Sequence, residues 1–84
     1  MTEKLNLKEI SMLMNNVESS NIAQIGYDTT TFSLFVSLKG TNVIYQYLAV
    51  PKHVYVELVQ AKSKGKYHAT NIKNKFKFEK ILVE

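Results

Sequence analysis

The stretch AQIGYDTTTFSLFVSLKGTNVIYQYLA, residues 23–49, decides the fold. Within residues 23–28, and again within residues 32–38, apolar side chains alternate with small or polar ones, which is typical of β-strands. The next residues, 39–42, contain the glycine and asparagine that a tight turn needs. A third strand then follows over residues 43–49, which are rich in β-branched and aromatic side chains. The pattern predicts an antiparallel β-meander of three strands.

The register of this meander follows from closing each turn symmetrically. A turn at Asp28-Thr29-Thr30 places Tyr27 opposite Phe32, and the second turn places Leu38 opposite Val43. One face of the sheet is then strongly apolar, and we expect helices to cover it. Its residues are Ala23, Ile25, Tyr27, Phe32, Leu34, Val36, Leu38, Val43, Tyr45 and Tyr47.

The opposite face mixes polar residues with Phe35, Ile44 and Leu48, which are too apolar to be left in solvent. A chain of 84 residues without cysteine has a small core and no disulfide to reinforce it. We therefore expect these three residues to form the interface of a homo-oligomer.

Helices are predicted before and after the meander in the sequence. Apolar residues at spacings of three and four predict a short amphipathic helix over residues 7–15, within an N-terminal segment 1–18 that precedes a domain over residues 19–84. Pro51 begins a second helix that ends near Lys62. Ser63 then caps a third helix, which turns Ala69, Ile72 and Phe76 inward. The alternation over residues 76–81 predicts a terminal strand or an extended tail. The predicted fold class is α+β, a three-stranded meander packed against two C-terminal helices.

Composition narrows the classes of function. His53 and His68 are isolated, so they do not supply the four ligands of a structural zinc site, and no nucleophile–base–acid constellation stands out. We expect no catalytic activity, no metal and no cofactor. The N-terminus lacks the pattern of a signal peptide or membrane span. We therefore expect a cytoplasmic protein. Asn and Lys are abundant and Arg is absent, which indicates a gene of low GC content, as in many Firmicutes and their phages, so the expected setting is a bacterium or a phage-infected cell.

Positive charge is concentrated near the C-terminus. Residues 1–61 carry four lysines and five acidic residues, whereas residues 62–84 carry seven lysines and two glutamates, a net charge of +5. Such a charge either keeps a small protein soluble or attracts an anionic ligand.

The candidate ligand site is Ser63-Lys64-Gly65-Lys66-Tyr67, with Lys73 behind it. A capped helix start offers free backbone N–H groups and a partial positive charge, and the lysines add full charges. The alternative is an ordinary turn between two helices. Tyr45 and Tyr47 lie on one side of a strand and form either a stacking platform for bases or part of the core. Asn21 is expected to contact a ligand or to cap the chain locally.

Several stretches together resemble the KTSC family, which is named after a module at the C-terminus of some lysyl-tRNA synthetases and also occurs as a free-standing protein. They are Ser19-Ser20-Asn21-Ile22 with Ile25-Gly26-Tyr27-Asp28, Tyr45-Gln46-Tyr47, Val50-Pro51 with Val54-Tyr55, Ser63-Lys64-Gly65-Lys66-Tyr67, and the tail from Ile72 to Glu79. The chain departs from the family's pattern at His68, Ala69, Thr70 and Asn71. The resemblance implies the fold and, through the synthetase, a role in RNA binding.

Three functions follow from these observations. The first is capture of a phosphate-bearing nucleotide, for example by a viral protein that sequesters a cyclic oligonucleotide immune signal. The second is RNA binding, although the chain lacks arginine and confines its charge to one region. The third is assembly with another protein through the apolar patch or the N-terminal helix.

Overall fold

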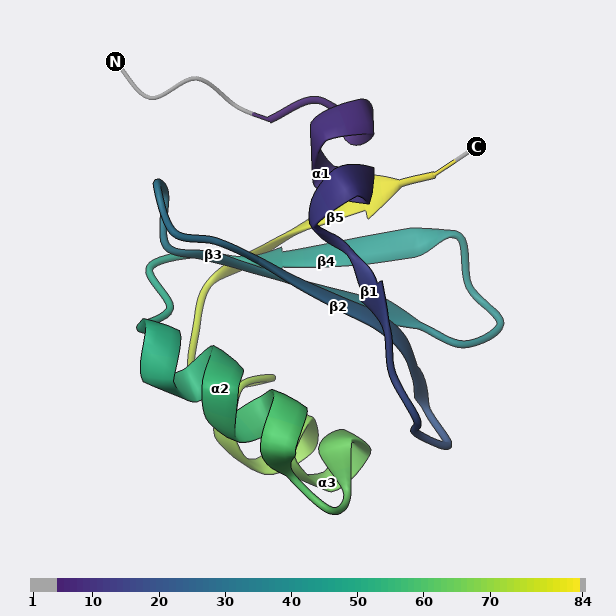
Figure 1. The fold of residues 1–84 in the computed structure, drawn as a ribbon, viewed down its shortest axis with the longest axis vertical. Coiled ribbons are helices and arrows are strands. Elements are labelled where there is room, and N and C mark those ends of the chain that lie inside the picture. The colour runs from purple at the N-terminus through teal and green to yellow at the C-terminus, as the bar shows by residue number, and fades with distance from the viewer. Residues whose placement is uncertain (1–4, 84) are drawn as a thin grey trace.

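The computed structural model describes residues 5–83, so the ends of the predicted segments 1–18 and 19–84 lie outside the described residues. Within that range the chain forms one antiparallel sheet with strands in the order β1-β2-β3-β4-β5, together with three helices (Figure 1). The α+β class is confirmed, but the sheet has five strands where the sequence predicted three. The elements are α1 (Leu7–Leu13), β1 (Asn15–Asn16), β2 (Ile22–Asp28), β3 (Ser33–Leu38), β4 (Val43–Tyr47), α2 (Lys52–Gln60), α3 (Lys64–Asn71) and β5 (Phe78–Leu82).

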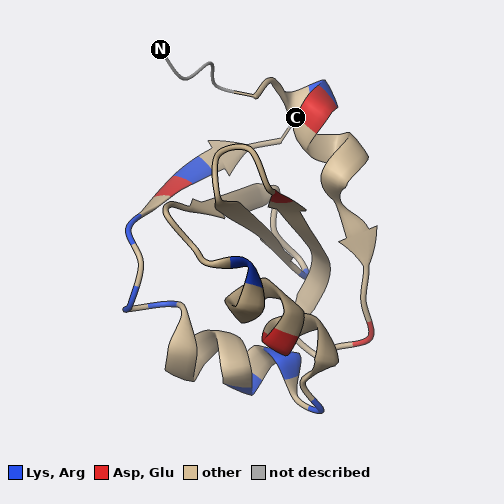
Figure 2. Cartoon of the chain, turned by 60° about the vertical axis from the view of Figure 1, so that its left-hand side comes forward, with Lys and Arg blue, Asp and Glu red and all other residues tan. Residues whose placement is uncertain are grey.

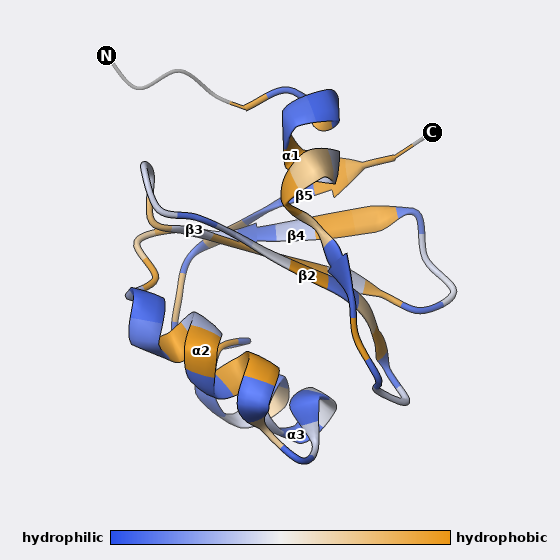
Figure 3. Cartoon of the chain, in the orientation of Figure 1, coloured by the Kyte–Doolittle hydropathy of each residue, from blue (hydrophilic) through white to orange (hydrophobic). Residues whose placement is uncertain are grey.

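Each face of the sheet is covered by helices. α2 and α3 lie on one face and α1 lies on the other, with β5 next to α1 in the view of Figure 1. Val54 and Leu58 of α2 are buried against the sheet, as predicted, and Figure 3 shows apolar residues along α2 whereas α3 is mostly hydrophilic. The main core consists of Ile22, Ile25, Tyr27, Leu34, Val36, Tyr47, Val50, Val54, Leu58 and Ile72. None of the helices in residues 5–83 is long and apolar enough to cross a membrane.

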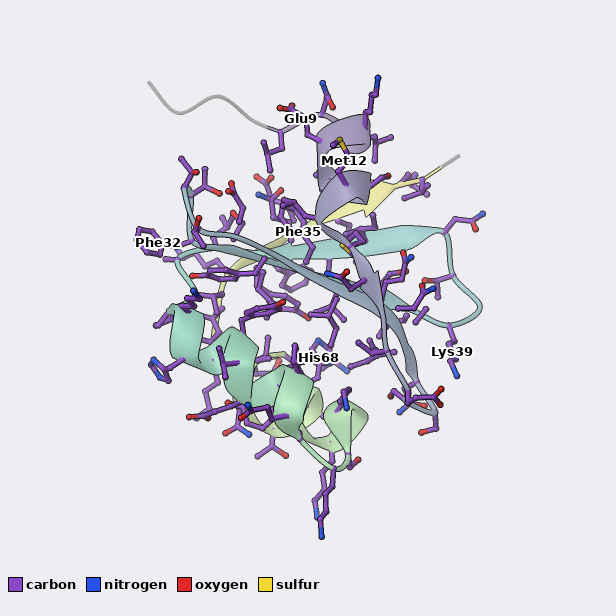
Figure 4. The ribbon with its side chains drawn as sticks, in the orientation of Figure 1. Glu9, Met12, Phe32, Phe35, Lys39 and His68 are labelled. Atoms are coloured by element: carbon purple, nitrogen blue, oxygen red, sulfur yellow. The ribbon has the colours of Figure 1, made fainter. Side chains whose placement is uncertain are left out.

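The register between β3 and β4 is as predicted, but the register between β2 and β3 is shifted. Tyr27 pairs with Leu34 and not with Phe32. The cause is a longer turn, in which the Asp28 carboxylate accepts hydrogen bonds from the Thr30 N–H at 3.1 Å and the Thr31 hydroxyl at 2.6 Å. Phe32 belongs to this turn, has a φ of 55°, and points outward (Figure 4). A shift of two residues keeps the paired side chains of β2 and β3 on their predicted faces. The placement of Phe32 on the covered face is wrong, because the turn leaves its side chain 56% exposed.

The edge of β2 carries a second difference. The pairing of β2 with β3 shifts between Ile22 and Gln24, as in a β-bulge. As a result Ile22 is fully buried, and Ala23, which we expected in the core, is only half-buried.

The apolar patch that we expected at an oligomer interface is covered within the chain. Phe35 and Ile44 pack against Ile10 of α1, and Phe35 is 0% exposed. Figure 4 shows Phe35 on the side of the sheet where α1 lies. Leu48 is half-buried just beyond β4, where its N–H donates to the Lys77 carbonyl at 2.8 Å. The interface prediction assumed that this face is open to a second copy. That assumption is wrong, because α1 occupies the face. Self-association itself stays a prediction.

The helices begin close to their predicted starts, but α3 ends at Asn71, so Ile72 and Phe76, which we expected on its inner side, follow the helix. α1 ends at Leu13, two residues early, because Asn15 and Asn16 pair with β2 as strand β1. Pro51 is the N-cap of α2 and precedes its first turn, while Ser63 caps α3 by accepting from the Lys66 N–H.

The C-terminal elements complete the sheet. The stretch after α3 returns as β5, which pairs with β4 at the edge of the sheet, so the strand alternative is confirmed. His68 of α3 and Ile72 at its C-cap are buried at the sheet. Ala69, which we expected to turn inward, is exposed, so that prediction is wrong.

Candidate functional site

A cavity of about 620 Å³ opens between α3 and the sheet face on which it lies. It is bounded by the start of β2, the turn from β3 to β4, the inner residues of β4 and β5, and the segment after α3. Small-molecule sites commonly measure about 300–1,000 Å³, so this cavity has the size of a ligand site.

Aromatic rings form one wall of the cavity. Phe78 of β5 pairs with Tyr47 of β4, and its ring centroid lies 5.7 Å from that of Tyr47 and 5.6 Å from that of Tyr45. Tyr45 and Tyr47 are two residues apart on one strand, which puts their rings on the same face at 6.4 Å. Phe78 is 45% exposed, so an apolar ring remains open to a ligand.

Three lysines surround this wall. Lys39 lies in the turn after β3, Lys73 follows α3, and Lys80 lies on β5. The Lys80 ammonium is 5.9 Å from the centroid of the Tyr45 ring, a cation–π distance. Among the described residues no Asp or Glu lines the cavity, and Figure 2 shows lysine along the connection from α3 to β5. The lysines that line the cavity therefore have no carboxylate of residues 5–83 beside them in the lining.

The floor of the cavity contains a buried pair of polar side chains. The Tyr47 hydroxyl lies 2.8 Å from Nε2 of His68, whose ring meets the Tyr47 ring edge-on. Burial raises the pKa of Tyr47 to about 12. Burial, and then the charge of Lys73, lower the pKa of His68. Both groups are consequently neutral at pH 7.

Amide and glycine residues close the end of the cavity nearest the start of β2. Gly65 of α3 faces Asn21, and a Cβ at position 65 would lie 3.1 Å from the Asn21 side-chain nitrogen. Asn21 is held by its backbone, because its N–H donates to the Ser19 hydroxyl and its carbonyl accepts from the Lys39 N–H. Both residues line the cavity, together with Ser20, Thr41 and Asn74.

The structure brings together five of the nine residues predicted for the ligand site. Asn21, Tyr45, Tyr47, Gly65 and Lys73 all line the cavity.

The other four residues lie elsewhere. Ser63, Lys66 and Tyr67 line a separate hollow on a different face of α3, where the Tyr67 hydroxyl donates to the Glu57 carboxylate at 2.6 Å. Burial and this hydrogen bond raise the pKa of Tyr67 to about 12. Lys64 is half-buried, and its ammonium donates to the Ala61 carbonyl at 3.2 Å. The predicted ligand site at the start of α3 is therefore not one site, because successive residues of the helix point in different directions.

Sequence reasoning missed four principal groups of the cavity, Lys39, His68, Phe78 and Lys80. The signal for His68 was its spacing of four from Ile72, which places both on the inner side of α3. The signal for Phe78 and Lys80 was the alternation along β5, which aligns them with Tyr47 and Tyr45. Within residues 5–83 no three side chains of His, Cys, Asp or Glu gather as a possible metal site, and the absence of catalysis stays a prediction.

Comparison with known proteins gives the family of the fold that carries this cavity. Residues 18–76 match the model of the KTSC domain. The chain belongs to the KTSC domain family. A crystal structure of a KTSC domain protein from Yersinia pestis superimposes with a TM-score of 0.77 at 37% identity, covering 81% of this chain and 94% of that one.

Two lysine–tRNA ligases also resemble this KTSC chain. The ligase of Trichormus variabilis is 41% identical and that of Nostoc punctiforme is 39% identical, each over 64 residues. These residues are 76% of this chain but 11% of each ligase, so the likeness concerns a small part of those proteins.

Proposed function

We propose that this KTSC protein binds a phosphate-bearing nucleotide in the cavity between α3 and the sheet. The observation that carries the proposal is the union of an exposed aromatic wall with three lysines in one cavity of about 620 Å³. Every nucleobase has a π-face that stacks on an aromatic ring, and a phosphate pairs with ammonium groups.

The two chemical parts of a nucleotide have separate counterparts in the cavity. Phe78 and Tyr45 offer ring surface, whereas Lys39 and Lys80 are exposed and able to follow a phosphate. Because no acidic side chain of residues 5–83 lines the cavity, no carboxylate there repels the phosphate.

The proposed action is capture without conversion of the ligand. The neutral Tyr47–His68 pair forms hydrogen bonds but has no neighbouring carboxylate in the cavity to orient it for proton transfer. A small protein of this kind acts by holding its ligand, and a cyclic oligonucleotide signal removed from solution is one such ligand.

Calorimetric titration with mononucleotides, cyclic di- and trinucleotides and short RNA tests the proposal. The double variant Lys39→Ala/Lys80→Ala should lose roughly tenfold or more in affinity, since charge-assisted hydrogen bonds contribute about 1.5–3 kcal/mol. The control Lys62→Ala/Lys66→Ala removes the same charge outside the cavity and should retain affinity within about twofold, the small long-range share of a screened surface charge. Equal losses in the two variants, or no binding by the wild type, would defeat the proposal. Chromatography of the recovered ligand should show it unchanged.

RNA is the second candidate ligand, because the related ligases are named for tRNA. An RNA strand would also contact lysines outside the cavity, including Lys62 and Lys66, so both double variants would weaken binding. The affinity would fall steeply with salt, with a slope of about −0.7 for each phosphate neutralised on a single strand. A compact nucleotide, which meets only the cavity lysines, should give a shallower slope.

A further inference from the structure

The buried pair on the cavity floor determines which nitrogen of His68 carries the proton. Tyr47 is 2% exposed, and within residues 5–83 its hydroxyl has one hydrogen-bond partner, Nε2 of His68. A buried hydroxyl hydrogen needs an acceptor, and no other acceptor is bonded to it among the described residues. Nε2 is therefore the acceptor, because the opposite arrangement would leave the hydroxyl hydrogen buried and unpaired.

A neutral imidazole has one protonated and one unprotonated nitrogen. Since Nε2 accepts from Tyr47, Nδ1 carries the hydrogen. No hydrogen bond of the described residues involves this second nitrogen, although the side chain lines the cavity. Nδ1–H is consequently a donor without a protein partner among residues 5–83. No buried side-chain nitrogen of these residues lacks a partner, so Nδ1 is an accessible part of a side chain that lines the cavity.

We propose that His68, oriented by the Tyr47 hydroxyl, is a specificity-determining residue that donates from Nδ1 to an uncharged acceptor of the ligand, the carbonyl oxygen of a nucleobase. This inference rests on the proposed nucleotide function. An uncharged acceptor is favoured because burying a phosphate on the floor would cost more than leaving it beside Lys39 and Lys80, which are exposed. The base therefore enters first and the phosphate stays at the rim.

The tautomer can be tested in the free protein. Long-range ¹H–¹⁵N correlation spectra at neutral pH should show His68 as the Nδ1–H form, and the variant Tyr47→Phe should shift it toward a mixture of tautomers. An Nε2–H form in the wild type would overturn the inference.

The ligand contact is tested with two pairs of 5′-monophosphates, inosine against adenosine and uridine against cytidine. The members of each pair differ at one edge of the base, where the first has a carbonyl beside a ring N–H and the second has an amino group beside an unprotonated ring nitrogen. The wild type should bind the carbonyl member roughly tenfold more tightly, because the carbonyl oxygen accepts from Nδ1–H whereas the amino group places a second donor against it. Tyr47→Phe should reduce this preference to about threefold or less, and the control Tyr55→Phe, which removes a hydroxyl outside the cavity, should retain it.

The outcomes separate this inference from the proposed function. Salt-dependent binding of all four monophosphates without preference would overturn the role of His68 and leave nucleotide binding in place. A preference that survives in Tyr47→Phe would also overturn it. No binding of any probe would overturn the proposed function, and the inference with it.

Discussion

Gly65 lies against the side chain of Asn21 so closely that a methyl group at position 65 would come 3.1 Å from the Asn21 nitrogen. A contact this short forces one of the two groups to move. Asn21 has an exposed side chain while its backbone is fixed by two hydrogen bonds, so its amide is the part that yields. Because both residues line the cavity, this contact links the position of α3 to the shape of the site.

The first prediction concerns this contact. Gly65→Ala should displace the Asn21 amide, which lowers nucleotide affinity several-fold and cancels the roughly 1 kcal/mol that alanine gains over glycine in a helix. In an Asn21→Ala background the same change should be stabilising. Chemical denaturation of the four proteins in this double-mutant cycle should give a coupling of at least about 0.5 kcal/mol. Additive effects would show that the two side chains do not restrain one another.

The second prediction concerns the sheet face beneath α1. Phe35→Glu would bury an unpaired carboxylate, which costs several kcal/mol, a large part of the roughly 5–15 kcal/mol that stabilises a typical domain. Thermal unfolding should therefore show a large fall in Tm or a loss of the folded state. Met12→Glu is the control, because Met12 lies on α1 and its side chain is 79% exposed.

Light scattering distinguishes this result from the oligomer prediction. If Phe35 lay at an interface between copies, the variant would stay folded and become monomeric. A folded, monomeric Phe35→Glu variant would contradict the packing of α1 on this face.

The third prediction concerns pH. Burial lowers the pKa of His68 below its ordinary value of 6.5, so the unfolded chain binds the proton more readily than the folded chain. The free energy of unfolding should then be highest above pH 6.5 and should fall as the pH drops below that value, until the folded form is also protonated. His68→Asn should flatten this part of the profile. The exposed His53 supplies the control, and His53→Asn should retain the slope.

The fourth prediction concerns backbone strain before α2. Ala49 has a φ of 54°, a left-handed conformation that costs a residue with a Cβ about 1–2 kcal/mol. Ala49 is exposed, so Ala49→Gly removes the strain without opening a cavity and should raise the free energy of unfolding by about 0.5–1 kcal/mol. Ala61 has an ordinary φ of −65°, and Ala61→Gly should destabilise the protein. The same sign for both variants would argue against strain at position 49.

The meander could be predicted from sequence because alternation and turn residues are local signals. The face assignments of Ile25, Leu34 and Tyr47 were right even though the register of β2 and β3 was not, since an error of two residues preserves the pleat. The longer turn could not be predicted, because it depends on the hydrogen bonds of Asp28 with Thr30 and Thr31.

The strands β1 and β5 illustrate a different limit. β1 is only two residues long, too short to show an alternation, and it pairs with the next strand, β2. β5 agrees with the predicted terminal strand, but alternation does not indicate its partner β4, which lies before two helices in the sequence. The packing of α1 on Phe35 is likewise a tertiary contact. From the sequence alone, the same apolar residues are predicted to lie at an interface between copies of the chain.

The candidate site was predictable in composition and not in geometry. The expectation of aromatic rings beside lysines agrees with the cavity, but the sequence grouped residues that are neighbours along α3, such as Lys66 and Tyr67. The residues of α3 that line the cavity are instead on the face of Gly65 and His68, because His68 and Ile72 turn toward the sheet. Packing decides which residues of a short polar helix turn inward. The apolar stripe of α3 is too weak to predict this from the sequence.

The last strand has a consequence for how this family diversifies. The KTSC match ends at residue 76, yet Phe78 and Lys80 supply an aromatic ring and a positive charge to the cavity. Under the proposed function, part of the ligand contact would come from β5, an edge strand whose side chains contribute little to the main core. We expect relatives with other residues at the positions of Phe78 and Lys80 to keep the architecture while binding a different ligand.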